Sequence, residues 1–339
     1  MKQTARIIST YSADTFGVCS ALFELGGMVV MHDASGCNST YTTHDEPRWY
    51  DMDSMVYISG LSEMEAIMGD DEKLIGDIVD AAENLQPKFI AIAGTPIPTM
   101  TGFDYTAVAE LVEERTGIPA FGFPTTGMNT YVFGASMAFA GIARRFVKKN
   151  VEKTTHLSAN ILGVTPLDFS VNGSDRSMKE FLEKAGFEVI SSWAMGSSLE
   201  ELAEAGGASV NLVVSSTGIE AARALKEMFG TPYVVGTPIG NAFQNILVQE
   251  LLEAAKTGKM PEKNRRPLMK SSLTGSEIAV IGEGVTALSL AHAIELEYQR
   301  SVKILCTTEC EKIYLREKDA LTTCEDEIMD ALQGVKMVI

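Results

Sequence analysis

The chain has 339 residues and a formal net charge of −17, and 45% of its residues are hydrophobic while 22% are charged. This length suits two or three domains with cores of their own, and the balance of residues is that of a globular protein. The acidic excess would repel a phosphate backbone, so nucleic-acid binding is not expected, whereas a partner with a basic face would be attracted.

The apolar stretches of the chain all fall short of the ~20 residues that a membrane span needs. Residues 1–10 also lack the apolar segment of a secretory signal. We therefore expect a cytoplasmic protein that does not contact a membrane and whose thiols are reduced. Five cysteines are an odd number for a disulfide framework, so they are either buried fillers or metal ligands.

Short apolar runs alternate with amphipathic stretches, a pattern typical of β-α-β units with parallel strands. In the first part of the chain this pattern predicts strands at Met28–His32, Met55–Ser59, Lys88–Ala93 and Ala120–Phe123, and helices at Glu72–Asn84, Tyr105–Thr116 and Tyr131–Lys149. In the second part it predicts strands at His156–Gly163, Glu188–Ser191, Ser209–Ser215 and Tyr233–Val235, and helices at Ser177–Lys184, Leu199–Ala205 and Gly218–Phe229. Gly186 and Gly230 follow two of these helices, where a left-handed C-terminal cap is favoured.

The last part of the chain follows a polar, basic stretch, residues 256–275, that is typical of a linker. It predicts strands at Glu277–Gly282, Val302–Cys306 and Val335–Ile339, and helices that end near Glu297 and Leu332. We therefore expect three consecutive parallel-sheet, Rossmann-like α/β domains, at residues 1–155, 156–258 and 276–339, with a linker at 259–275. The third domain would be short. The chain stops on a predicted strand, so either the chain is short for its architecture or a partner covers this edge of the sheet.

Three segments occur in an order that is known from one family. Residues 14–37 read DTFGVCSALFELGG and then, after Met28, VVMHDASGC, which is similar to a pattern of one cysteine, a small-residue helix, a strand and His-Gly-x-x-Gly-Cys. Residues 94–104, GTPIPTMTGFD, are similar to Thr-x-Cys-x-x-x-x-Ile-Gly-Asp-Asp. Between Asn160 and Gly240, short motifs follow one another in the order found in the second domain of that family. Together these segments resemble the nitrogenase component 1-type oxidoreductases over the whole chain.

That family includes nitrogenase component 1, its cofactor-assembly scaffold, the dark-operative protochlorophyllide and chlorophyllide reductases, and the nickel-sirohydrochlorin reductive cyclase. The resemblance implies three parallel α/β domains, an iron–sulfur cluster at a subunit interface and electrons supplied by an ATP-dependent iron protein. It assigns Cys19 and Cys37 as metal ligands, and it places Gly36, Thr95 and Pro96 beside the cluster.

The chain departs from the family pattern in three places. Pro96 occupies the position of a third cluster cysteine and has no ligand atom, and Ser215 lies roughly where nitrogenase has a cofactor cysteine. The short third domain lacks the region that would carry that cofactor's histidine. Dinitrogen reduction is therefore not expected, and the type of cluster stays open.

Cys19 and Cys37 are 18 residues apart and form no short Cys-x-x-Cys run, so their spacing alone predicts no metal site. Cys37 directly follows a strand, at the sheet edge where open α/β folds bind ligands, and Gly36 permits close backbone approach. We expect Cys19 at a helix start, where the helix dipole lowers a thiol pKa. The two cysteines are either buried fillers or ligands of a [4Fe–4S] cluster. The order of segments shared with the family favours the cluster. Such a cluster needs four ligands, so a homodimer or heterodimer with a second component 1-like subunit would complete it.

Several titratable residues near these cysteines are candidates for catalysis. His32 is either a proton relay or a structural histidine. His44, Asp45 and Glu46 belong to a polar loop that either protonates a substrate or is simply solvated. An acidic run, residues 63–71, is either a solvated face or a docking surface.

Other motifs have simpler explanations. Residues 95–100 predict a rigid loop beside the site, and residues 125–130 offer a helix cap and a backbone anion site. Gly282–Ala287 fits the dinucleotide pattern G-x-G-x-x-A, but Glu309, the candidate ribose acid, is 27 residues after Gly282 rather than the usual ~20. Cys306 and Cys310 have no second pair to complete a zinc site and are expected to be structural.

These observations predict the catalytic component of a nitrogenase-like reductase. It would accept electrons from an ATP-dependent iron protein through an interface iron–sulfur cluster and reduce a small-molecule substrate that the sequence does not identify. One alternative is a non-catalytic scaffold for metallocluster or cofactor assembly. Another is a dinucleotide-dependent oxidoreductase that uses Gly282–Ala287.

Overall fold

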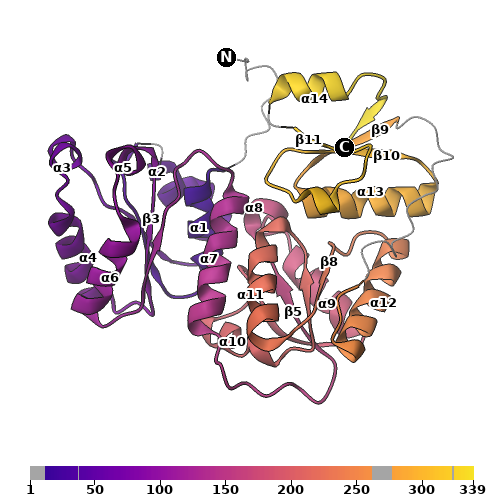
Figure 1. The fold of residues 1–339 in the computed structure, drawn as a ribbon, viewed down its shortest axis with the longest axis horizontal. Helices are drawn as coiled ribbons and strands as arrows, with labels where there is room; N and C mark the ends of the chain where they lie inside the picture. Colours follow the sequence, from indigo (N-terminus) through magenta and orange to yellow (C-terminus); the bar gives the residue numbers. More distant parts are fainter. Residues whose placement is uncertain (1–11, 37, 262–276, 323) are drawn as a thin grey trace.

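Three parallel β-sheets follow one another along the chain, each with helices packed against it (Figure 1). The computed structural model describes residues 12–36, 38–261, 277–322 and 324–339. Each sheet has four strands, and neighbouring strands in all three run parallel. The predicted α/β fold of three consecutive Rossmann-like units is therefore confirmed. We refer to them as the first, second and third unit.

The first unit has the strand order β2-β1-β3-β4. Its strands are β1 (Met28–Met31), β2 (Met55–Ile58), β3 (Ile90–Ala93) and β4 (Ala120–Phe123). Two apolar cores flank the sheet, one beneath α1 (Asp14–Leu22) and α7 (Tyr131–Phe146), the other beneath α4 (Asp71–Leu85) and α6 (Tyr105–Thr116). Because β1 and β3 are covered on both faces, all their residues are buried, which explains their continuous apolar sequences.

Three short helices lie at the carboxyl ends of these strands. They are α2 (Asn38–Thr40), α3 (Glu63–Met68) and α5 (Pro96–Thr101). The rigid loop expected at residues 95–100 is therefore wrong, because Pro96 begins a helix. Proline is tolerated there, since the first residue of a helix needs no backbone N–H partner.

The second unit has the strand order β6-β5-β7-β8. Its strands are β5 (Ser158–Leu162), β6 (Glu188–Ser192), β7 (Val210–Val213) and β8 (Tyr233–Val235), and its helices are α8 (Pro166–Phe169), α9 (Ser174–Lys184), α10 (Leu199–Ala203), α11 (Ile219–Phe229) and α12 (Asn241–Thr257). Helix α12 was not predicted. The expected left-handed caps are confirmed, with φ of +87° at Gly186 and +68° at Gly230.

The third unit has the strand order β11-β10-β9-β12. It contains β9 (Ile278–Gly282), α13 (Gly284–Tyr298), β10 (Val302–Cys306), β11 (Ala320–Leu321), α14 (Glu325–Ala331) and β12 (Met337–Val338). Helix α13 packs against α12 of the second unit (Figure 1). The predicted linker, residues 259–275, lies largely outside the described residues. None of the described helices is long and apolar enough to cross a membrane.

Helices α1 and α7 cross so closely that only glycine fits at the crossing. A Cβ atom on Gly17 would lie 2.1 Å from the carbonyl oxygen of Tyr131, and one on Gly134 would lie 1.8 Å from the carbonyl oxygen of Asp14. Helix α7 also packs against α11 of the second unit, and one apolar core spans both units. This crossing fixes α1, which carries Cys19, against the boundary between the first two units.

Candidate functional site

The carboxyl ends of β1 and β3 lie side by side and are joined by polar side chains. The hydroxyl of Thr95 donates to the carbonyl oxygen of His32 at 2.7 Å and to the carboxylate of Asp33 at 3.1 Å. Asp33 also accepts a hydrogen bond from the side-chain amide of Asn38 at 2.5 Å. These bonds hold the segment on both sides of Cys37, which itself lies outside the described residues.

Gly36 and Pro96 border this edge without supplying a ligand atom. A Cβ atom on Gly36 would meet nothing within 4 Å, so the backbone there faces open space. Pro96 packs against Gly127, where an added Cβ would lie 2.9 Å from the proline ring. The open space at Gly36 would allow a bulky group to approach the backbone beside Cys37.

Cys19 is fully buried inside α1, as the sixth of its nine residues. The expectation that it begins a helix and has a lowered thiol pKa is therefore wrong. Burial raises the pKa of Cys19, and the carboxylate of Glu46 raises it further. Helix α1 also contacts the segment that follows Cys37, because the ring of Phe16 stacks on that of Tyr41 with 5.1 Å between centroids and the hydroxyl of Ser20 donates to Glu46. Sequence distance hides this proximity, because it arises only when α1 packs on the sheet.

His32 is buried, with 5% of its surface exposed, at the end of β1. Its Nδ1 lies 2.9 Å from the hydroxyl of Ser59, and its ring lies 4.5 Å from that of Phe103, between centroids. Burial lowers the pKa of His32 to about 4, although Asp33 and Glu65 oppose that shift. The imidazole is therefore neutral near pH 7 and is poorly suited to deliver a proton there.

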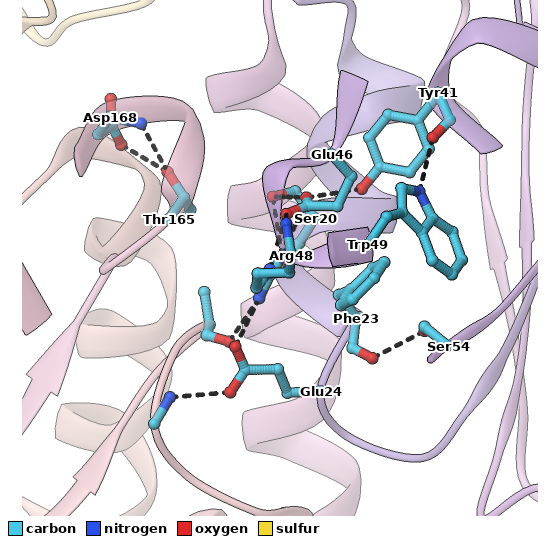
Figure 2. A network of polar contacts seen from close by, with 12 residues as sticks. Ser20, Phe23, Glu24, Tyr41, Glu46, Arg48, Trp49, Ser54, Thr165 and Asp168 are labelled. Carbon is cyan, nitrogen blue, oxygen red and sulfur yellow. Dashed lines mark hydrogen bonds and ion pairs between the residues drawn. The ribbon is translucent and has the colours of Figure 1, made fainter. Parts of the chain in front are cut away.

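Glu46 lies in the interior rather than in a solvated loop. None of its surface is exposed, and its carboxylate accepts hydrogen bonds from Ser20 and Tyr41, each at 3.0 Å (Figure 2). The Nε of Arg48 lies 2.7 Å from the same carboxylate. Glu46 is therefore buried and paired with a buried guanidinium, so the reading of this loop as simply solvated is wrong for Glu46.

The other two residues of that loop are placed differently. Asp45 is exposed and accepts a hydrogen bond from the hydroxyl of Thr40 at 2.8 Å. His44 lies in the same π-helical turn, Tyr41–Asp45. The side chain of His44 is outside the described part of the structure. The polar loop is therefore split, with one carboxylate in the core and one in solvent.

Arg48 connects the first unit to the second. Its guanidinium donates to the carbonyl oxygen of Ala194 at 3.0 Å and to Glu24 at 3.1 Å, and it lies 4.6 Å from the ring centroid of Phe23 (Figure 2). Glu24 in turn accepts a hydrogen bond from the backbone N–H of Gly196 at 2.9 Å. The cysteine-bearing segment is thus locked against the second unit through one buried arginine.

A second group of titratable residues lies where the three units meet, and no sequence motif pointed to it. Asp168, in α8, accepts hydrogen bonds from the phenol of Tyr131 in the first unit and from the hydroxyl of Thr165. Burial raises the pKa of Asp168 to about 7, and the carboxylate of Glu283 in the third unit adds to the rise. This carboxyl therefore exchanges a proton near neutral pH, at a point that all three units help to form.

Glu283 and Glu309 explain why the dinucleotide pattern is not favoured. The carboxylate of Glu283 caps α13 by accepting from the backbone N–H groups of Val285 and Thr286, each at 2.9 Å. It also accepts from the N–H of Ser216 at 2.9 Å. Glu309 binds the backbone N–H of Thr130 at 2.9 Å. The carboxylate of Glu283 thus takes the backbone N–H groups that a pyrophosphate would need, and Glu309, the candidate ribose acid, is bound to Thr130 instead.

The predicted anion site at residues 125–130 is likewise filled by the protein. Asp14, which is fully buried, accepts hydrogen bonds from the backbone N–H groups of Thr126 at 3.0 Å and Gly127 at 2.7 Å. The side-chain amide of Asn129 donates to it at 3.0 Å. The motif does bind a carboxylate, but one from α1 of the same chain.

A family model confirms what the fold indicates. The model of nitrogenase component 1 type oxidoreductases matches residues 14–335. The chain belongs to this family. A nitrogenase structure, "Nitrogenase Cp1 at pH 6.5", superposes with a TM-score of 0.69 over 100% of this chain and 79% of that one, at 19% identity. At that identity the superposition supports the shared fold alone.

Curated relatives in the family carry different activities. The chain is 26% identical over 230 residues to one of the subunits of the light-independent protochlorophyllide reductase of Cereibacter sphaeroides, covering 62% of this chain and 42% of that one. It is 25% identical to the nitrogenase molybdenum-iron protein alpha chain of Clostridium pasteurianum, covering 67% and 41%. It is 27% identical to the cofactor biosynthesis protein NifE of the same organism, covering 52% and 38%. The aligned part spans less than half of each relative.

The described residues of this component 1-type chain include one of the two predicted cluster ligands, Cys19. No group of three or more His, Cys, Asp or Glu side chains among them is placed to hold a metal ion. Cys19 offers a buried sulfur whose thiol form is favoured by burial and by Glu46, and nearby iron would supply the positive charge that favours the thiolate instead. Cys19 and Cys37 would hold the group from this chain, and other ligands would come from a second one.

Proposed function

We propose that this chain is the catalytic component of a nitrogenase-like reductase, whose interface iron–sulfur cluster accepts electrons from an ATP-dependent iron protein. The observation that supports it most directly is the buried sulfur of Cys19. The helix that carries it contacts the segment that follows Cys37, in a chain that matches the component 1 family from residue 14 to residue 335. When bound, the cluster would take up and pass on single electrons.

The chain's own residues have separable roles in this proposal. Cys19 and Cys37 bind the cluster, and Thr95 and Asp33 orient the segment between β1 and α2 through their hydrogen bonds. The Glu46–Arg48 pair holds the following turns against the second unit. Asp168 is the described carboxyl group best suited to hold a proton at neutral pH, because its pKa is raised to about 7.

An apolar surface at the same sheet edge is where a second component 1-like subunit would dock. Helix α3 has no buried residue, and its side chains Met64, Ile67 and Met68 are 66–72% exposed on one helical stripe. The neighbouring α5 exposes Met100 to 87%. Contiguous exposed methionines are typical of protein-binding surfaces, and a subunit seated here would lie next to the incomplete ligand set.

The docking surface can be tested by a charge inside it. We expect Met68→Glu to convert the assembly to a smaller species in sedimentation velocity, because a carboxylate in an apolar interface loses its hydration. Met329→Glu, at a position 54% exposed in the third unit, is the matched control and should leave the sedimentation coefficient unchanged. An equal effect of both variants, or of neither, would contradict docking at α3.

The cluster can be tested after anaerobic purification, by iron and sulfide analysis and by EPR. The expected result is about two iron atoms per chain, as for a four-iron cluster shared across a dimer. Cys19→Ala and Cys37→Ala should each lose that iron, while Cys324→Ala should keep it. A wild type that stays free of iron after cluster reconstitution would overturn the proposal.

A scaffold for cofactor assembly is the second candidate, and one observation favours it. At the cysteine-bearing edge, His32 is neutral near pH 7 and Glu46 is paired with Arg48, so neither is an available proton donor. A relative of similar identity is named as a cofactor biosynthesis protein. ATP-dependent electron transfer from an iron protein, followed through the EPR signal of the cluster, would favour the reductase. A cluster or cofactor that passes to an acceptor protein without electron input would favour the scaffold.

A further inference from the structure

The third unit contains a pair of cysteines that the cluster proposal does not use. Cys306 is the last residue of β10 and is fully buried, and Cys310 is partly exposed in the loop that follows. Both sulfur atoms converge on Gly284, the first residue of α13. A Cβ atom placed there would lie 2.4 Å from the sulfur of Cys310 and 3.4 Å from that of Cys306. Any side chain at residue 284 would separate the two thiols, and glycine lets them meet.

The two thiols form a hydrogen bond with each other, and this bond shifts their pKa values in opposite directions. A hydrogen bond from Cys310 lowers the pKa of Cys306, and the same contact raises the pKa of Cys310. The sulfur of Cys306 also contacts the carbonyl oxygen of Thr308 at 3.5 Å. The carboxylate of Glu283 opposes ionisation of both thiols. Adjacent sulfurs with one accessible member are the arrangement in which thiol–disulfide exchange closes an intramolecular disulfide.

The loop between these cysteines attaches the third unit to the other two. Glu309 binds Thr130, the residue that precedes α7 in the first unit. Glu311, one residue beyond Cys310, forms an ion pair with Arg223 on α11 in the second unit. A disulfide between Cys306 and Cys310 would therefore affect a segment that contacts both the first and the second unit.

We propose that Cys306 and Cys310 form a redox-active dithiol, and that its conversion to a disulfide changes how residues 307–311 hold the three units together. This role goes beyond the proposed function and does not require a cluster. The oxidant is a low-molecular-weight disulfide. Cys310, the accessible member, passes its proton to the thiolate of Cys306 as it attacks one sulfur of the small disulfide and releases one small thiolate. Cys306 then gives up that proton, attacks the sulfur of Cys310 and releases the second small thiolate. The protein loses two electrons and two protons, and the small disulfide gains both as two thiols.

The test is to incubate the full-length protein, purified without oxygen, with oxidised glutathione, and to map peptides without reduction. We expect a peptide cross-linked between Cys306 and Cys310 and a loss of two of the five thiols of the chain. Cys324→Ser, the control, should give the same cross-link. Cys306→Ser and Cys310→Ser should abolish it, with a glutathione adduct on Cys310 in the first variant.

Hydrogen exchange of the oxidised wild type provides the second readout. We expect faster exchange at residues 130–133 and 307–311, similar to that of a Glu309→Gln variant in the reduced state, and a return to slow exchange after reduction. Separate glutathione adducts on Cys306 and Cys310 without a cross-link would overturn the dithiol. A cross-link without any change in exchange would overturn its effect on the units. Neither result depends on iron content, so failure here is distinguishable from failure of the proposed function.

Discussion

The cysteine-bearing edge of the first unit and the junction of the three units differ in whether their buried carboxylates have compensating partners. At the edge, the carboxylate of Glu46 is matched by Arg48, and that of Asp14 by backbone N–H groups. At the junction, Asp168 lies near a second carboxylate, Glu283, and receives only neutral donors. A buried carboxylate with a cation or N–H donors beside it has its charge compensated, whereas burial and a second carboxylate raise the pKa of Asp168 so that it keeps a proton it can exchange. The edge is thus suited to positioning and the junction to proton chemistry.

The largest effect is expected at the edge, from Arg48→Met. This variant leaves the buried carboxylate of Glu46 without its cation, and breaking such a pair costs about 3–5 kcal/mol of the free energy of unfolding. Urea unfolding followed by circular dichroism measures it. The matched control is Lys88→Met, which removes an exposed pair with Glu200 and should change stability by less than ~1 kcal/mol. Similar values for both variants would remove the distinction between matched buried and exposed charge.

The second effect concerns pH and His32. Its folded pKa of about 4 is below the ordinary value of 6.5, so the unfolded state binds more protons between these values. Stability should therefore fall as pH decreases from about 6.5 to about 4, by roughly 3 kcal/mol in total. His32→Gln should show a shallower slope in this window. The measurement is urea unfolding at several pH values, and equal slopes would show that His32 does not titrate as its burial indicates.

The third effect has the opposite sign and comes from Asp168. Its folded pKa of about 7 is above the ordinary value of 3.8, so the folded state binds more protons in that window. Stability contributed by this group should therefore fall as pH rises from about 4 to about 7. Asp168→Asn should remove this loss while His32→Gln does not. Infrared difference spectra provide a direct check, since the wild type should lose a protonated-carboxyl band near pH 7 that the variant lacks.

The smallest effect is expected at the contact between Glu309 and Thr130. Glu309→Gln keeps the size of the side chain but removes the charge that strengthens its two hydrogen bonds, so we expect a loss of about 1 kcal/mol. Limited proteolysis should cut the loop after β10 more readily in this variant. Glu317→Gln, on the same unit, is the control. Unchanged proteolysis in Glu309→Gln would show that this contact does not hold the junction.

Local sequence predicted most of the elements but few of the contacts. Helix α6 occupies the predicted residues 105–116, because its apolar positions, its aspartate cap and its terminal glycine all agree. Helix α5 was missed because two prolines in six residues suggested a loop, although the first residue of a helix accepts proline. The position of Cys19 was misjudged because its helix begins five residues earlier, at Asp14. The side chain of Asp14 does not mark that start locally, since it accepts from the backbone of a distant segment.

The sequence by itself determined the three-unit α/β architecture, the family and the segments around Cys19 and Cys37, because strand and helix periodicity and motif order are local properties. Only the tertiary structure decided which polar residues are available. It buried Glu46 against Arg48, placed Asp14 and Glu283 on backbone N–H groups that motifs alone offered to ligands, and brought Asp168 to the boundary of three units. Burial and the sign of the nearest charge set the protonation of each group, and both depend on residues far apart in the chain.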